Sequence, residues 1–173
     1  MFFEWVRTIL ILPGSVLVFF PALALYLADY RWEFSSIPLF TAGCVLLCVG
    51  LSLAAWTMWL FAKKGRGTAA PWTPPKYLVV EGPYRHVRNP MITSVLTLLI
   101  AEALLLNSWL PMGIFALFLG GNMLYFPFVE EKSLENRFGP DYLAYKREVP
   151  RWLPRIKPFE PASRGASGTD SPD

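Results

Sequence analysis

The sequence predicts an all-α, multi-pass membrane protein: a bundle of about four transmembrane helices, the last two forming a hairpin, followed by a short surface helix. Of its 173 residues, 54% are hydrophobic and only 17% are charged, which is more apolar side chain than a soluble domain of this size can bury. The apolar residues also fall into four long runs, at 8–28, 36–61, 91–106 and 109–128. Hydrocarbon cannot satisfy free backbone polar groups, so these runs are expected to be helices rather than open strands.

The run lengths decide which helices can cross a bilayer. A helix needs about 20 residues to span ~30 Å of hydrocarbon, so the first, second and fourth runs are long enough. The third run is marginal and carries Glu102. A short turn after Asn107 and a helix start at Pro111 join it to the fourth run. The segment 91–128 is therefore predicted to be a helical hairpin.

The distribution of charge predicts the topology. Six basic residues and one acid, Glu81, lie in 62–90, whereas the short link 29–35 carries both signs. The positive-inside rule therefore makes 62–90 a cytosolic loop, and counting the spans makes both termini and 129–158 cytosolic as well. A signal peptide is the competing interpretation, with a core at 8–20 and a cleavage pattern at 22–24. The apolar run continues past that pattern, which favours a retained first span.

The chain changes character after residue 128. The fourth helix is expected to continue until Gly139 and Pro140 break it, and a short helix at 142–148 follows. One stripe of that helix is apolar and is expected to lie along the membrane surface. Residues 159–173 have the composition of a disordered tail, which leaves 1–158 as a single domain. The stripe consists of Tyr142, Tyr145 and Val149.

The stretch "VEGPYRHVRNP", residues 80–90, concentrates polar side chains between two apolar runs. It leads into Pro90 as the first residue of the third helix, and a helix start offers free N–H groups to an anion. Glu130 and Glu131 leave the membrane on the same face, and because adjacent helical residues point about 100° apart, at most one faces a given pocket. A site with an anion-binding side and a cation-binding side is one interpretation. A basic loop at lipid phosphates and a solvated helix end is the other.

Two motifs together carry a family resemblance. "GPYRHVRNPM", followed some forty residues later by "EEKSLENRFGPDYLAYKREVPRWLP", resembles the isoprenylcysteine carboxyl methyltransferases and, more loosely, the phospholipid methyltransferases. The upstream "GRGTAAPWTPPKYLVV" is similar to the bacterial branch, which implies a bacterial inner-membrane protein. The resemblance covers about residues 65–155.

The resemblance implies a membrane-embedded methyltransferase that binds S-adenosylmethionine on the cytosolic side and methylates a lipophilic acceptor from the bilayer. That acceptor would be an isoprenylcysteine-like carboxylate, a lipid amine or a thiol. Glu130 and Arg88 are the implied catalytic pair. The implied cofactor-binding residues are Leu78, Val79, Tyr84, Arg88, Asn89, Pro90, Met91, Ile92, Glu130 and Glu131.

The chemistry of the cofactor agrees with this set. Its carboxylate suits Arg88 or helix N–H groups, its ammonium, ribose and sulfonium suit Glu130, and its adenine suits aromatic and aliphatic walls. An amine acceptor would need a base, for which Glu130, Glu131 and His86 are candidates, although His86 is better explained as a surface contact.

Three positions depart from the family pattern. Many members have His where this chain has Asn89, and Tyr where it has Ile92. Phe126 stands where the eukaryotic prenylcysteine enzymes have an arginine that contacts the acceptor. Asparagine does not titrate near neutral pH, so proton chemistry of a histidine at position 89 is excluded. The departures also weigh against copying the prenylcysteine substrate.

Two other functions stay open from the sequence. The C-terminal pattern distantly resembles membrane sterol reductases that bind NADPH, although few basic residues are left to hold a 2′-phosphate. A non-catalytic membrane protein that binds lipid or a partner is the third reading. Cys44 and Cys48 lie one helical turn apart without a nearby histidine or acid, so no metal site is predicted. No nucleic-acid partner is expected.

Overall fold

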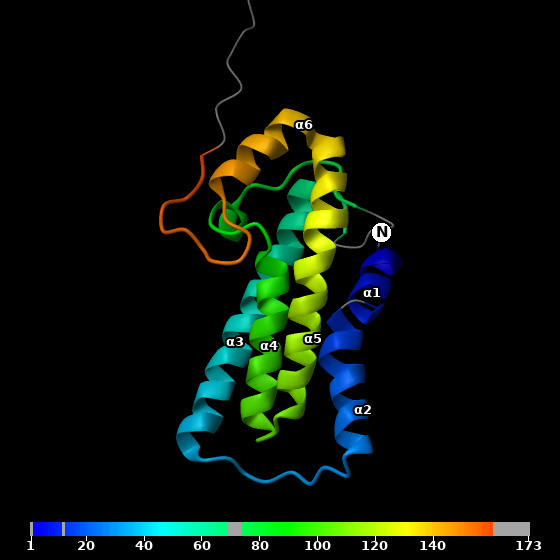
Figure 1. The fold of residues 1–173 in the computed structure, drawn as a ribbon, viewed down its shortest axis with the longest axis vertical. Coiled ribbons are helices and arrows are strands. Elements are labelled where there is room, and N and C mark those ends of the chain that lie inside the picture. The colour runs from blue at the N-terminus through cyan, green and yellow to red at the C-terminus, as the bar shows by residue number, and fades with distance from the viewer. Residues whose placement is uncertain (1, 12, 69–73, 161–173) are drawn as a thin grey trace, which may run out of the picture.

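The computed structural model describes residues 2–11, 13–68 and 74–160. Figure 1 shows the long helices side by side in an upright bundle, with a smaller region at one end. We call that region, residues 61–68, 74–90 and 131–160, the head. The elements, including three π turns and one 3-10 turn (η), are α1 (Phe2–Ile11), η1 (Ser15–Phe19), α2 (Phe20–Leu27), α3 (Ile37–Leu60), η2 (Phe61–Gly65), η3 (Gly82–Arg85), α4 (Pro90–Leu105), α5 (Leu110–Tyr125), η4 (Phe126–Glu130) and α6 (Glu131–Glu148).

The predicted all-helical membrane architecture is confirmed. Within the described residues, three helices are long and apolar enough to cross a membrane: Val6–Leu27, Ile37–Gly65 and Leu110–Glu148. The third predicted run forms a shorter apolar helix, α4, which begins at Pro90 as expected. A short turn separates it from α5, which has Pro111 in its first turn. The predicted hairpin is therefore present.

The short helix α4 lies between α3 and α5 (Figure 1). Glycines on α3 allow this close packing: a Cβ on Gly50 would stand 2.7 Å from Cγ of Leu98, and one on Gly43 would stand 2.8 Å from Cγ of Leu105. Small residues are what let helix backbones approach closely in membranes. On α4, Leu99 is fully buried. Protein therefore surrounds much of α4, the least lipid-facing helix of the bundle.

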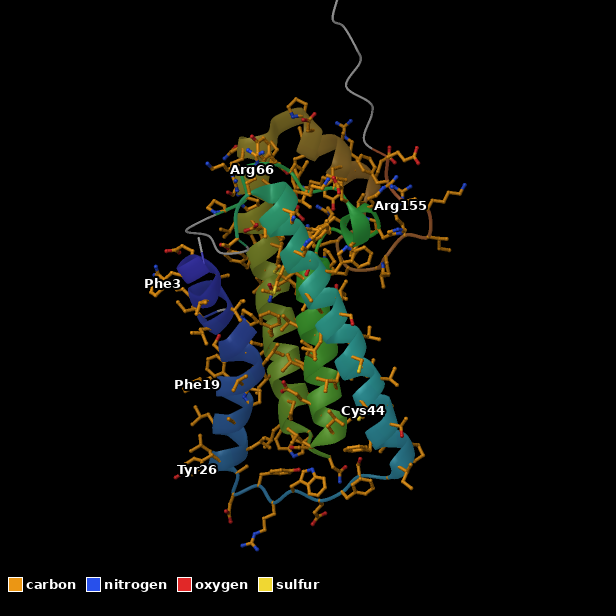
Figure 2. The ribbon with its side chains drawn as sticks, turned by 180° about the vertical axis from the view of Figure 1, so that it is seen from behind. Phe3, Phe19, Tyr26, Cys44, Arg66 and Arg155 are labelled. Atoms are coloured by element: carbon orange, nitrogen blue, oxygen red, sulfur yellow. The ribbon has the colours of Figure 1, made fainter. Side chains whose placement is uncertain are left out.

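The first span contains a π turn near its middle. Pro13, which has no N–H to give to a helical hydrogen bond, and Gly14 precede the π turn η1, and α2 follows directly. Figure 2 shows side chains of almost only carbon along the middle of the bundle, with Phe19 and Cys44 labelled there, and polar atoms at its ends. The exposed carbon surface is the one that a bilayer would cover.

The predicted break in the last helix is confirmed. Gly139 has φ 52° and ψ −127°, Pro140 follows, and the second half of α6 ends at Glu148, shortly before Pro150. All of these residues lie in the head at the same end of the bundle as the segment that precedes α4 (Figure 1). The described residues of the loop 62–90 and residues 131–160 therefore lie at one end of the bundle, as the sequence predicted.

The apolar stripe of the second half of α6 was expected to lie on the membrane surface, and this expectation is wrong. Tyr142, Tyr145 and Val149 are buried in a protein core together with Phe159. Leu78 and other partly buried residues pack against this core. The stripe is apolar because it faces protein.

The predicted start of the tail at residue 159 is also wrong. Phe159 is buried, its ring lies 5.6 Å from that of Tyr145, and its backbone N–H donates to the carbonyl of Arg85. The fixed part of the chain therefore extends at least to this residue. The rest of the predicted tail, residues 161–173, lies outside the described residues.

Backbone hydrogen bonds join the segment 85–88 to the segment 150–159. Arg88 N donates to Pro150 O, Arg155 N to His86 O and Phe159 N to Arg85 O, each at 2.9 Å. We call this pairing the clasp. It ties the polar stretch before α4 to the C-terminal part of the head.

Candidate active site

A cavity of about 660 Å³ lies where the head meets the bundle. Its walls come from η1, the segment before η3, the start of α4, the end of α5, η4 and α6. It contains eight of the ten residues that the sequence proposed as cofactor-binding: Leu78, Val79, Tyr84, Arg88, Asn89, Met91, Ile92 and Glu130. Segments far apart in the sequence thus bring the proposed residues to one space.

The two remaining residues do not line the cavity. Pro90 is fully buried at the start of α4, where its fixed φ angle suits the first turn of the helix. Glu131 points into a different environment, although it is the direct neighbour of Glu130. Its side chain is only 5% exposed and belongs to a cluster of ion pairs.

Three cations surround the carboxylate of Glu131. Arg88 Nη1 and Arg151 Nη2 lie 2.9 and 2.7 Å from Oε1, and Lys146 Nζ lies 2.9 Å from Oε2. Lys146 also pairs with Glu135 at 2.7 Å. A buried carboxylate is tolerated when charged partners compensate its lost hydration in this way. Glu131 therefore joins the start of α4, both halves of α6 and the chain beyond α6.

Glu130 owes its position to the π turn η4. Pro127 lies inside this turn and has no N–H for a regular helical bond, and the helix continues through Glu131 without a break. π turns inside helices are frequent at functional sites because they re-aim side chains. Glu130 faces the cavity and interacts electrostatically with Arg137, which also donates to the carbonyl of Pro75.

The segment before α4 is shaped by Gly82 and Tyr84. Gly82 has φ +55°, and a Cβ there would stand 2.9 Å from the ring of Trp56. The turn after it buries Tyr84, whose ring packs edge-on against Phe61 at 5.4 Å. The hydroxyl of Tyr145 donates to the carbonyl of Tyr84 at 2.7 Å. The wall of the cavity is thus held from both the bundle and the head.

Three polar groups of the cavity-lining residues are buried without a hydrogen-bond partner within the described part of the chain: Oη of Tyr84, Nε of Arg88 and Nδ2 of Asn89. Burial raises the pKa of Tyr84 well above its usual value, and the nearby Tyr145 adds to the increase. The phenol therefore stays a neutral donor. Buried donors without partners are costly, so the start of α4 holds polar groups that nothing in the described part of the chain stabilises.

Several lining residues were not proposed from the sequence. Arg137 lies seven residues after Glu130, two turns farther along the same helix face. Asn122 lies two turns before Glu130 in α5, and its Nδ2 donates to the carbonyl of Phe118 at 2.7 Å. An amide within an apolar run was the available signal for Asn122. The apolar side chains of Val16 and Phe118 extend the cavity along the bundle.

His86 lies outside this cavity. Its Nδ1 is 2.8 Å from the carbonyl oxygen of Arg155, which makes the ring part of the clasp. It lines a separate, shallow pocket beside α3 instead. The ring therefore helps to hold the segment before α4 against the C-terminal part of the head.

The fold and the site together define an integral-membrane protein with a cavity that is polar toward the head and apolar toward the bundle. The family model of phospholipid methyltransferases matches residues 39–141, and the chain belongs to this family. The match extends from α3 to the kink in α6 and includes all eight of the proposed lining residues. Members are methyltransferases, so membership supports an enzyme that methylates a lipid-type acceptor. Neither the curated proteins nor the solved structures contain a match to this chain.

Proposed function

We propose that this protein transfers a methyl group from S-adenosylmethionine to a lipophilic acceptor at the cytosolic face of a bacterial inner membrane. The observation that carries the proposal is the composition of one cavity. Arg88, Asn89 and Glu130 line it together with apolar side chains of the bundle such as Phe118. A charged, water-soluble cofactor and an oily acceptor need these two environments next to each other.

The residues present fit the cofactor. Arg88 and Asn89, which line the cavity, would donate to its carboxylate, and the bond from the guanidinium would be charge-assisted. Glu130 would accept from its ammonium or ribose hydroxyls. The walls formed by Tyr84 and Leu78 suit the adenine ring. The volume of about 660 Å³ lies within the ~300–1,000 Å³ of most small-molecule sites.

The chain's own contribution to methyl transfer would be orientation and exclusion of water. When bound, the cofactor supplies an electrophilic methyl group on a positively charged sulfur. Met91, Ile92 and Val129 give the cavity apolar walls, and a dry centre favours a reaction in which that charge disappears. Holding two reactants at ~3–3.5 Å accounts for much of the acceleration in such transfers. For an amine acceptor, a carboxylate oxygen of Glu130 can take up the proton.

The acceptor class follows from the cavity wall near η4. Phe126 lines the cavity at the position where the prenylcysteine enzymes that this chain resembles have an arginine. An aromatic ring provides no positive charge for a carboxylate, so a lipid amine or thiol is a better acceptor here than an isoprenylcysteine-like carboxylate. The apolar part of the cavity along α5 would take the lipid chain.

Calorimetric titration of the purified protein in lipid nanodiscs tests the cofactor. S-adenosylhomocysteine should bind, and NADPH should not. Binding of NADPH alone would support the reductase alternative, and binding of neither ligand would leave only a lipid- or partner-binding role. As a control, Glu148→Gln changes an exposed acid of α6 outside the cavity and should bind S-adenosylhomocysteine as the unchanged protein does.

A radiolabel assay then tests the reaction. The protein would be mixed with methyl-labelled S-adenosylmethionine and with lipids that carry amine, thiol or isoprenylcysteine headgroups. We expect the label to appear in the lipid phase when the lipid carries the amine or the thiol. Label only in the isoprenylcysteine carboxylate would overturn the acceptor assignment while leaving methyl transfer intact.

A further inference from the structure

The segment 151–158, "RWLPRIKP", carries the most exposed apolar side chains of the head. Leu153 is 79% exposed and Ile156 is 96% exposed. The same eight residues include three bases, Arg151, Arg155 and Lys157, and no acid. Single exposed apolar residues are ordinary, but apolar side chains alternating with bases are typical of segments that lie in a membrane interface.

This segment is held in place rather than hanging loose. The clasp fixes both of its ends, since Arg88 N donates to Pro150 O and Phe159 N donates to Arg85 O. In its middle, Arg155 donates its backbone N–H to His86 and pairs with Glu148 at 3.4 Å. The two apolar side chains are thus exposed on a fixed backbone, so they present a defined surface.

The segment lies at the level where the bundle would leave the membrane. Pro158, at its end, lines a shallow pocket together with Trp56 and Leu53 of α3 and with Arg85 and His86. Trp56 and Trp59 are each half exposed on α3 near its head end. Tryptophans gather at the headgroup level of membrane proteins. Figure 1 shows the orange 150–160 segment turning back from α6 toward the bundle, and Figure 2 labels Arg155 at this edge of the head.

We propose that residues 151–158 form an interfacial loop that inserts into the headgroup region of an anionic phospholipid bilayer, the membrane that the bundle spans. Leu153 and Ile156 would enter the boundary between headgroups and acyl chains. Lys157, which is exposed, and Arg155 would contact lipid phosphates, where each base near an anionic surface strengthens binding. This inference does not depend on the proposed enzymatic function.

Site-specific fluorescence tests the loop. In a Cys44→Ser, Cys48→Ser background, Ile156→Cys would carry an environment-sensitive probe, and Asn136→Cys, an exposed position in α6, would carry the same probe as control. The full chain would be placed in nanodiscs of phosphatidylcholine with or without phosphatidylglycerol. Lipids brominated near the top of the acyl chain would serve as quenchers.

The expected result is a blue-shifted, strongly quenched probe at position 156 and a water-like, unquenched probe at position 136. Quenching at 156 should be stronger with phosphatidylglycerol, and Lys157→Glu should remove that difference. A water-like probe at 156 in both nanodiscs would overturn the interfacial loop. Equal quenching in both lipid compositions would overturn the phosphate contact and leave an anchor that is apolar only.

Discussion

Glu130 and Glu131 are neighbours in the chain, yet one lines the cavity and the other is enclosed by Arg88, Lys146 and Arg151. The separation follows from helical geometry, because adjacent side chains diverge by about 100°. Glu130 is therefore free to meet a ligand, while Glu131 holds together the segments that build the cavity. The two residues should respond differently to the same chemical change.

Glu130→Gln should weaken binding of S-adenosylhomocysteine by roughly 10- to 100-fold, because it replaces a charge-assisted hydrogen bond with a neutral one. The thermal unfolding temperature should stay close to that of the unchanged protein, since Arg137 keeps its bond to the carbonyl of Pro75. Titration calorimetry and differential scanning measure the two quantities. Unchanged affinity would remove Glu130 from the site.

Glu131→Gln should instead destabilise the head. It leaves three cations without their shared carboxylate, and breaking a buried pair costs about 3–5 kcal/mol. Arg151 and Lys146 are 26% and 34% exposed, so water offsets part of the loss and the low end, about 3 kcal/mol, is expected. Denaturant unfolding would measure this, with Glu148→Gln as the matched control. A fully stable variant that loses only ligand binding would contradict the structural role.

Asn122→Leu tests the amide that α5 contributes to the cavity wall. Removing this amide should lower kcat/KM for a lipid acceptor about tenfold, the value of one hydrogen bond, if Asn122 contacts the acceptor headgroup. Affinity for S-adenosylhomocysteine should not change, because Asn122 lies two helical turns from Glu130. Asn136→Leu, on the exposed side of α6, is the control. A parallel loss of cofactor affinity would assign Asn122 to the cofactor side.

Gly82→Ala should cost about 1–3 kcal/mol of stability, because a non-glycine residue is strained at φ +55° and the new Cβ would press on Trp56. Gly120→Ala provides the comparison, since a Cβ at that position in α5 meets nothing within 4 Å. That change should be neutral or stabilise the helix by about 0.5–1 kcal/mol. Equal effects of the two substitutions on thermal unfolding would refute the strained turn.

The spans, the hairpin and the break at Gly139 could be predicted because each depends on local features: apolar length, Pro111 and the Gly139–Pro140 pair. The sequence also singled out eight residues of the cavity wall, since the family motif brought Tyr84, Arg88 and Asn89 together.

Contacts between distant segments could not be predicted in the same way. An apolar stripe such as that of Tyr142 and Tyr145 looks the same whether it faces lipid or protein, and only the fold shows that Phe159 covers it. Likewise, the sequence does not show which of the adjacent Glu130 and Glu131 faces the three cations. Asn122 was missed because the sequence does not show that its face of α5 turns toward the segment before α4.

The shortness of α4 sets the depth at which the cavity lies. With only 16 residues, α4 is about 24 Å long, less than the ~30 Å of hydrocarbon. From the close contact of Gly50 with Leu98, the chain of α3 and η2 continues about 10 Å farther toward the head than α4 does. Asn89 and Met91, which line the cavity at the start of α4, therefore lie deeper in the bundle than the head end of α3 and η2. Under the proposed function, a phospholipid could be methylated while its acyl chains stay in their own leaflet. The water-soluble S-adenosylmethionine would enter the cavity from the head side to reach it.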